Sequence, residues 1–286
     1  MKLLRILIIL LALAAAKGAA AIGLDRVRFH NEAADTSAIT ALLIEAEPIK
    51  DPGQRVAMLA RKFLDRPYVA HTLEGEPETL TVNLDQLDCT TFVETVMTLA
   101  YTAGEGRTSW RDFIFNLERL RYRGGEMKGY PSRLHYISDW IVNNSHRGNF
   151  REVTDRLPSV SYAIKTLDFM SRHRDAYPAL ADDDNYEGIK YVELGYRSHR
   201  FPYIKWEKTD SRRVIDALGE GDILAFTCAA KDLDVSHLGI LTMVDGRPHV
   251  IHASSSAGKV VVSQHELREF LRRNHMTGIR VIRLNN

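Results

Sequence analysis

The sequence predicts an α+β fold, with helices in the first half of the chain and a mostly antiparallel sheet of about five strands in the last third. Apolar residues recur at helical spacing between residues 56 and 142, whereas the residues after 222 divide into short segments typical of strands. Asp245-Gly246 lies between two of these segments and is typical of a tight hairpin turn. Because the two patterns are segregated along the chain, no βαβ nucleotide-binding fold is expected.

The strongest helical pattern begins at Cys89. The apolar residues on one side of this helix are Phe92, Val93, Val96, Leu99 and Ala100. Further helices are expected at about 56–63, 109–121 and 132–142, with a short strand at 80–84. In the last third, strands are expected at 222–227, 237–244, 249–254, 259–263 and 278–284, and a helix at 265–273.

The middle of the chain has no regular pattern. Residues 148–209 contain Pro158, Pro178 and Pro202, and an acidic run at 182–184. A solvated surface loop explains the acidic run better than a calcium site does, because no EF-hand spacing follows it. We therefore expect one domain over residues 22–286, with a helical or irregular insertion at about 105–209.

Composition narrows the classes of function. The chain has 286 residues, of which 45% are hydrophobic and 26% charged, which is ordinary for a globular protein. The formal net charge is +1, so nucleic acid is not expected as a partner. Two cysteines are too few for a disulfide scaffold.

The first residues have the pattern of a secretory signal peptide. Lys2 and Arg5 precede an apolar run, and Ala19 and Ala21 form a cleavage signal of small residues. The apolar run is short for a membrane-spanning helix, which needs about 20 residues. Residues 1–21 are therefore expected to be removed, leaving an exported protein, periplasmic or secreted, without a stable membrane anchor.

Cys89 is the candidate nucleophile. Asp88 is a good helix N-cap, which places Cys89 in the first helical turn. A helix N-terminus favours the thiolate and offers free N–H groups to a developing oxyanion. A cysteine nucleophile also needs a base.

His237 is the best candidate base, and His252 the candidate partner that orients it. Both lie in predicted strands joined by the Asp245-Gly246 hairpin. If the hairpin loop has an even number of residues, the numbers of two residues that face each other across the strands add up to an odd number. The numbers 237 and 252 also add up to an odd number, so the two histidines then share one face of the sheet. A loop of three residues would place them on opposite faces.

Two other interpretations of these residues remain open. In an exported protein, Cys89 could pair with Cys228 in a disulfide. Alternatively, His135, His237 and His252 could bind zinc, although they lack a pair of ligands at short spacing. Neither a metal nor another cofactor is expected under the cysteine hypothesis.

Several motifs together resemble the NlpC-type papain-like cell-wall hydrolases. The motifs are Asp88-Cys89-Thr90-Thr91-Phe92-Val93-Glu94, Gly221-Asp222-Ile223 and Ser236-His237-Leu238-Gly239-Ile240. Cys89, His237 and His252 match the order of the family's catalytic residues. Tyr68-Val69 with Thr72-Leu73-Glu74, and the segment 132–140, resemble the N-acetylmuramoyl-L-alanine amidase-like branch.

This resemblance implies a papain-like core and hydrolysis of an amide bond in peptidoglycan fragments or muropeptides. The branch is similar to enzymes that cut between N-acetylmuramic acid and L-alanine. The resemblance also suggests five substrate-binding candidates, which are Tyr68, Asp88, His135, Asp139 and Ser236. Each has a structural alternative: Asp88 as a helix cap, His135 and Asp139 as a local pair, and Tyr68 as part of the core.

Two alternative functions follow from the same motifs. Wider relatives in the family cut the D-glutamyl–diamino-acid bond of the stem peptide. A papain-like domain that binds peptidoglycan without cutting it is the second alternative, and retention of the cysteine and both histidines argues against it.

Overall fold

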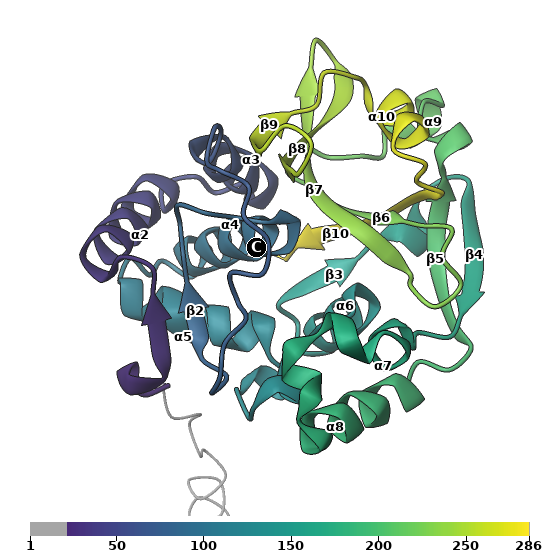
Figure 1. Ribbon diagram of the computed structural model, residues 1–286. Helices are drawn as coiled ribbons and strands as arrows, with labels where there is room; N and C mark the ends of the chain where they lie inside the picture. The colour runs from purple at the N-terminus through teal and green to yellow at the C-terminus, as the bar shows by residue number, and fades with distance from the viewer. Residues whose placement is uncertain (1–21, 286) are drawn as a thin grey trace, which may run out of the picture.

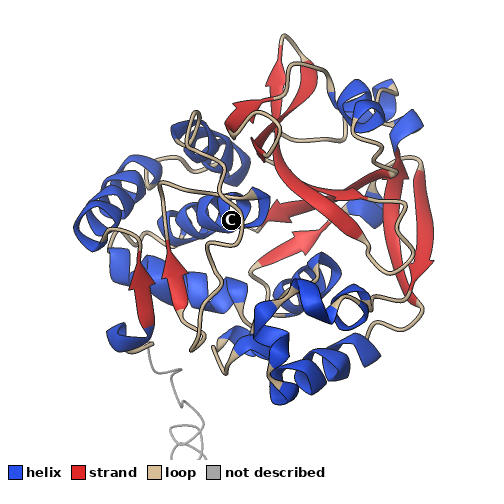
Figure 2. Cartoon of the chain, viewed as in Figure 1, coloured by secondary structure: helices blue, strands red, loops and turns tan. Residues whose placement is uncertain are grey.

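The computed structural model describes residues 22–285 and has an α+β fold, as predicted. The expected signal peptide, residues 1–21, lies outside the described residues. The first helices of the chain gather at the left of the molecule, whereas most of the strands lie at the right, where later helices pack around them (Figures 1 and 2). The helices at the left are α2 (Glu32–Ala46), α3 (Pro52–Lys62), α4 (Cys89–Gly104) and α5 (Trp110–Arg121). In the described part of the chain, no helix is long and apolar enough to cross a membrane.

The central element is α4, whose start at Cys89 agrees with the prediction. It contacts α2, α3 and α5 on the helical side, and the strands β7 (Val235–Val244) and β8 (Arg247–Ser254) on the other. Its apolar residues are fully buried, and Glu94 forms a buried ion pair of 2.7 Å with Arg121 of α5. These contacts fix α4 relative to the sheet. The helix expected at 132–142 starts later, as α6 (Ile137–His146).

The sheet has eight strands rather than about five, and all its pairings are antiparallel. Its order is β4-β5-β10-β6-β7-β8-β9, with β3 paired to β10. The strands not yet named are β3 (Phe150–Glu152), β4 (Val160–Lys165), β5 (His199–Lys205), β6 (Ile223–Thr227), β9 (Lys259–Val262) and β10 (Gly278–Leu284). A separate parallel pair joins β1 (Val27–Phe29) to β2 (Leu80–Val82).

The three unexpected strands come from the middle of the chain. Pro202 lies inside β5, and a proline within a pattern argues against a central strand because it has no N–H to donate. Here β10 pairs only with Ile204 and Lys205 of β5, so Pro202 lies beyond that ladder. The acidic run is also not a loop. Asp182 caps α8 (Asp183–Leu194), where carboxylates favour the positive end of the helix.

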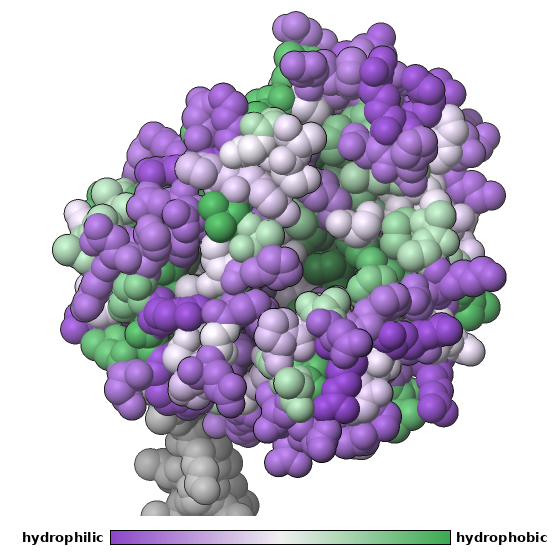
Figure 3. Space-filling model, viewed as in Figure 1, coloured by the Kyte–Doolittle hydropathy of each residue, from purple (hydrophilic) through white to green (hydrophobic). Residues whose placement is uncertain are grey.

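The two faces of the sheet have different neighbours. Ile223, Leu238 and Ile240 pack in the same core as α4, whereas Phe226 and Leu241 pack with α10 (Leu267–Arg273) on the opposite face. Figure 3 shows a hollow near the centre of the visible face, with apolar surface at its base. The remaining short helices are α7 (Phe169–Arg172) and α9 (Arg212–Ile215).

Candidate active site

The Asp88 side chain caps the helix that carries Cys89. Asp88 Oδ1 accepts from the Thr91 N–H at 2.7 Å, and the Thr91 hydroxyl accepts from the Asp88 N–H at 2.9 Å. This reciprocal capping box fixes the first turn. The N–H groups of Cys89 and Thr90 precede the first intrahelical hydrogen bond of the turn, so they are available to an oxyanion.

The Cys89 thiol lies against the backbone of β7. The Leu238 N–H, one residue after His237, donates to the sulfur, and the Thr90 hydroxyl lies 4.0 Å from it. Burial, followed by the charge of Asp88, raises the pKa of the thiol to about 11. A helix N-terminus favours the thiolate, but these two effects outweigh it here, so the thiol is protonated at neutral pH.

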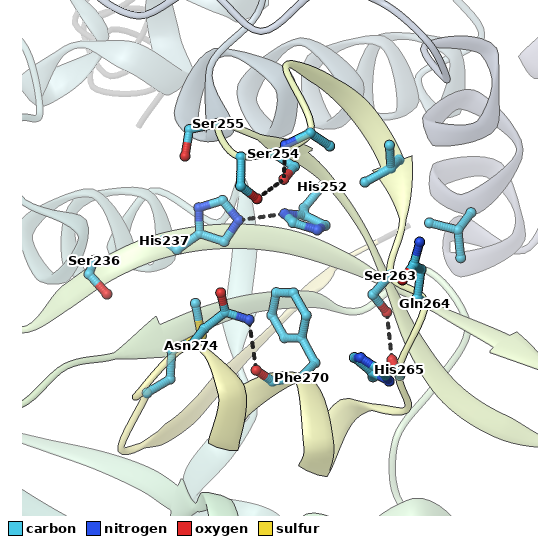
Figure 4. A pocket seen from close by; sticks show the side chains of 15 residues that line it. Ser236, His237, His252, Ser254, Ser255, Ser263, Gln264, His265, Phe270 and Asn274 are labelled. Atoms are coloured by element: carbon cyan, nitrogen blue, oxygen red, sulfur yellow. Dashed lines mark hydrogen bonds between the residues drawn. The ribbon is translucent and has the colours of Figure 1, made fainter.

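His237 and His252 form a hydrogen-bonded pair, with 2.8 Å between His237 Nε2 and His252 Nδ1 (Figure 4). The strands β7 and β8 are joined by the two-residue turn Asp245-Gly246, and their ladder pairs Ile240 with Ile251. In this register, residue 252 lies opposite Gly239, so the histidines are diagonal neighbours on one face. The prediction that they share a face is confirmed.

Two phenylalanines complete a ring of aromatic contacts around the histidines. His237 stacks on Phe226, its partner on β6, with ring centroids 5.7 Å apart. His252 meets His237 and Phe270 edge-on, each at 5.0 Å, and Phe270 lies 5.3 Å from Phe226. The sequence analysis did not identify these phenylalanines. Phe226 precedes Cys228 on a predicted strand, and Phe270 lies in the predicted helix at 265–273.

Both imidazoles are held neutral. Burial, and then the charge of His252, lowers the pKa of His237 to about 3, and burial lowers that of His252 to about 4. Because Nε2 of His237 is bonded to His252, only its Nδ1 is left to act on another group. Among residues 22–285, no hydrogen bond joins the Cys89 thiol to the His237 ring, and the thiol contacts β7 through Leu238 instead.

Three of the substrate-binding candidates surround this centre. The Tyr68 N–H bonds to the Gly258 carbonyl at 2.8 Å, and the charges of Cys89 and Asp88 add to burial in raising the Tyr68 pKa. Asp88 caps α4, which is the structural role that the sequence analysis gave as the alternative to substrate binding. Ser236 is exposed and lines the cavity beside His237.

The other two candidates have partners away from the histidine pair. His135 Nε2 lies 3.0 Å from the Tyr130 carbonyl, and its ring lies 4.4 Å from the Tyr130 ring. Asp139 is buried, pairs with Arg123 and accepts from the Tyr196 hydroxyl at 2.7 Å. His135 and Asp139 thus each form hydrogen bonds with other residues and not with one another.

The structure also shows the residues on which the disulfide and zinc-site interpretations depend. Cys89 and Cys228 are both free thiols, and the Cys228 thiol donates to the Leu233 carbonyl at 3.3 Å. Within the described part of the chain, no three histidine, cysteine or acidic side chains are grouped as metal ligands would be. His135 therefore does not complete a zinc site with the other two histidines.

A cavity of about 540 Å³ opens beside the histidine pair (Figure 4). It is enclosed by the end of β8, by β9 and the turn after it, and by α10. Its lining includes His237 and His252 but not Cys89.

Comparison with solved structures gives similar folds. An N-acetylmuramoyl-L-alanine amidase from Bacteroides uniformis is 38% identical, with a TM-score of 0.77, over 82% of this chain and 99% of that one. A Bacteroides fragilis protein, provisionally named a xylanase, is 38% identical, with a TM-score of 0.74, over 79% and 99%. A Legionella pneumophila protein, at 21% identity and a TM-score of 0.69 over 90% and 97%, shares the fold.

Comparison with curated proteins gives no match. The N-acetylmuramoyl-L-alanine amidase-like family matches residues 58–279, which is most of the chain and includes Cys89, His237 and His252. The chain therefore belongs to the N-acetylmuramoyl-L-alanine amidase-like family.

Proposed function

We propose that this protein hydrolyses the amide bond between N-acetylmuramic acid and L-alanine, with Cys89 as nucleophile, His237 as base and His252 as the residue that orients the base. Family membership supports a peptidoglycan hydrolase. The observation that carries the mechanism is the 2.8 Å bond between the histidines beside a thiol that touches the next residue of β7. We also propose that the core is papain-like, and that the protein is exported after removal of residues 1–21.

In the first step, His237 Nδ1 takes the thiol proton as the sulfur attacks the amide carbon. Nε2–H of His237 donates to His252 Nδ1, which fixes the tautomer that leaves Nδ1 with a lone pair. The carbonyl electron pair moves onto oxygen, where the N–H groups of Cys89 and Thr90 stabilise it. Collapse of this intermediate breaks the C–N bond, and His237 Nδ1–H protonates the leaving amine.

In the second step, water replaces the amine. His237 takes a proton from water as its oxygen attacks the thioester, and the C–S bond breaks. The sulfur leaves with its electron pair and recovers the proton from His237. The thiol and imidazole are thus neutral again at the end of the cycle, as the pKa directions of the resting site require.

The same residues argue against glycoside hydrolysis, which the name of the Bacteroides fragilis relative suggests. Glycosidases commonly use two carboxyl groups that flank the bond. Among the described residues that line the cavity beside His237, none is aspartate or glutamate. The D-glutamyl–diamino-acid bond remains the second candidate, because the same thiol chemistry would cut it.

Mass spectrometry of purified muropeptides incubated with the protein tests the proposal. We expect free stem peptides that begin with L-alanine, together with saccharides that carry a free lactyl carboxyl group. Tripeptide stems cut before the diamino acid would establish the endopeptidase alternative. Binding to sacculi without any released product would establish a binding module and contradict hydrolysis.

A further inference from the structure

His252 has a ring nitrogen to which the described part of the chain gives no partner. Its Nδ1 lies 2.8 Å from His237 Nε2. If Nδ1 accepts this bond, the neutral His252 ring carries its proton on Nε2. Among residues 22–285, no hydrogen bond is formed by Nε2, although His252 is only 8% exposed. Because a buried N–H donor without a partner costs free energy, we expect a group from outside the chain to accept from it.

This nitrogen faces the cavity of about 540 Å³ beside the histidine pair. His252 lines the cavity, and its Nε2 lies on the side of the ring away from His237 (Figure 4). The neighbouring rings of His237 and Phe270 meet His252 edge-on, each at 5.0 Å. The volume is large enough for a small organic molecule that contacts this nitrogen directly.

Other groups around the cavity can donate hydrogen bonds to the same molecule. Ser255 and Gln264 are exposed, and in the described part of the chain their side chains have no hydrogen bond. The Asn274 amide donates one N–H to the Phe270 carbonyl at 2.8 Å and has a second N–H free. None of the described lining residues is Asp, Glu, Lys or Arg, so no charge in the lining repels an anion or attracts a cation. Several free donors without a carboxylate suit a ligand group that only accepts hydrogen bonds.

We propose that this cavity binds a small free carboxylate compound, and that one carboxylate oxygen accepts the Nε2–H of His252. An ionised carboxylate only accepts hydrogen bonds, and such bonds from N–H groups to a charged oxygen are stronger than neutral ones. The cavity would then be an activator site of the enzyme, next to its base.

The bound charge would strengthen His237 as a base. With a pKa of about 3, the resting His237 is a weak base, and burial is the main cause. A carboxylate at His252 stabilises positive charge on the histidine pair and therefore raises the pKa of both rings. It has the same relation to His252 that the carboxylate of a Ser-His-Asp triad has to its histidine. The effect on His237 rests on the proposed function, whereas the binding of the carboxylate does not.

Titration with acetate, acetamide and sodium chloride at pH 7 tests the binding. Acetamide has nearly the shape of acetate without its charge, and chloride has the charge without the carboxylate. The wild-type protein carries isotope-labelled histidine, and NMR follows the nitrogen shift of His252 Nε2. We expect a saturable shift with acetate, an affinity for acetamide at least about tenfold weaker, and no shift with chloride at equal ionic strength. Absence of saturation with acetate, or equal affinity for acetamide, overturns the proposal.

Two variants locate the bound acetate. Gln264→Glu adds a negative charge to the lining with little change of shape, so we expect the acetate affinity to fall at least about fivefold. Gln54→Glu makes the same change at an exposed position of α3 and should leave the affinity unchanged. His252→Phe removes the Nε2–H and should abolish binding, followed at the Asn274 side-chain amide. Acetate affinity that is retained in both Gln264→Glu and His252→Phe overturns the proposal.

Hydrolysis of muropeptides by the wild-type protein is measured with and without saturating acetate. We expect acetate to raise kcat/KM at pH 7 at least about threefold, because a stronger base lowers the barrier to attack, and acetamide to have no effect. An unchanged rate with acetate bound overturns the activating role. Competition between acetate and muropeptide assigns the cavity to the substrate and also overturns the proposal.

Failure of this proposal and failure of the proposed function give different results. Saturable acetate binding without hydrolysis of any muropeptide contradicts the proposed function and leaves the carboxylate site in place. Hydrolysis that depends on Cys89, in a protein that does not bind acetate, contradicts the carboxylate site and leaves the proposed function in place.

Discussion

Burial keeps the groups neutral on both the thiol side and the histidine side of the site, but a different second feature accompanies it on each side. On the thiol side, burial and the charge of the capping Asp88 raise the pKa of Cys89. On the histidine side, burial lowers the pKa of both imidazoles, and the surrounding rings of Phe226 and Phe270 are apolar. Burial is the largest cause on both sides. The thiol side adds a specific charge, which one substitution can remove, whereas the histidine side adds a packed aromatic cluster.

As a consequence, the site holds no thiolate–imidazolium ion pair before substrate binds. Because the pKa of the Cys89 thiol is about 11 and that of the His237 imidazole is about 3, almost no thiolate is present at neutral pH. Proton transfer must therefore accompany attack, when the oxyanion contacts of the helix N-terminus can stabilise the developing charge. We therefore expect the Cys89 thiol to react slowly with alkylating agents.

The largest expected effect is on the thiol side. Cys89→Ser should lower kcat at least about 10³-fold, because a poorly activated hydroxyl replaces the nucleophile. Muropeptide hydrolysis followed by mass spectrometry measures the loss, and an unchanged thermal unfolding curve shows that the fold is intact. Cys228→Ser is the matched control and should remain active. Near-normal activity in Cys89→Ser would mean that another group is the nucleophile.

On the histidine side, substitutions of His237 and His252 should lower the activity by different amounts. His237→Ala should remove nearly all activity, because His237 exchanges protons in both steps. His252→Ala should be damaging but less so, since an orienting residue can cost less than a nucleophile or base. His252→Gln keeps a hydrogen-bonding group, so the acid limb of its kcat/KM profile should shift little. Full activity of His237→Ala beside an inactive His252→Ala would reverse the two roles.

The sequence predicted the parts of the site that depend on local patterns. Asp88 as a cap and Cys89 in the first turn follow from adjacent residues, and the shared face of the histidines follows from the two-residue hairpin. The direction of the thiol pKa could not be predicted, because burial of Cys89 depends on β7, which lies far along the chain.

The middle of the chain was predicted least well for the same physical reason. β3, β4 and β5 owe their stability to pairing with β10 and with one another, and not to a strong local pattern. Pro202 interrupts no pairing with β10, because β10 pairs with a different part of β5. Phe270 became part of the site through the packing of α10 on the sheet, which no local pattern indicates.

Phe270→Leu should have a smaller effect that is specific to the histidine side. Loss of the aromatic edge contact loosens His252, and greater access of water should raise its pKa from about 4. We expect kcat to fall about tenfold, because a loosely oriented base spends less time in the reactive geometry. Histidine titration by NMR measures the pKa. The control is Phe150→Leu, at a Phe–Trp contact outside the site, which should reduce stability without moving the histidine pKa values.

The smallest expected effect is that of Asp88→Asn, which isolates the charge on the thiol side. Asparagine is also a good N-cap and can accept from the Thr91 N–H, so the helix should be retained. A nearby carboxylate disfavours the thiolate, so its removal should lower the pKa of Cys89 from about 11. The rate of alkylation by iodoacetamide should then rise at pH 8, and its midpoint should move to lower pH. Asp51→Asn makes the same change at the cap of α3 and should leave the alkylation rate of Cys89 unchanged. An unchanged midpoint in Asp88→Asn would show that burial alone holds the thiol neutral, and the two sides of the site would then work by one device rather than two.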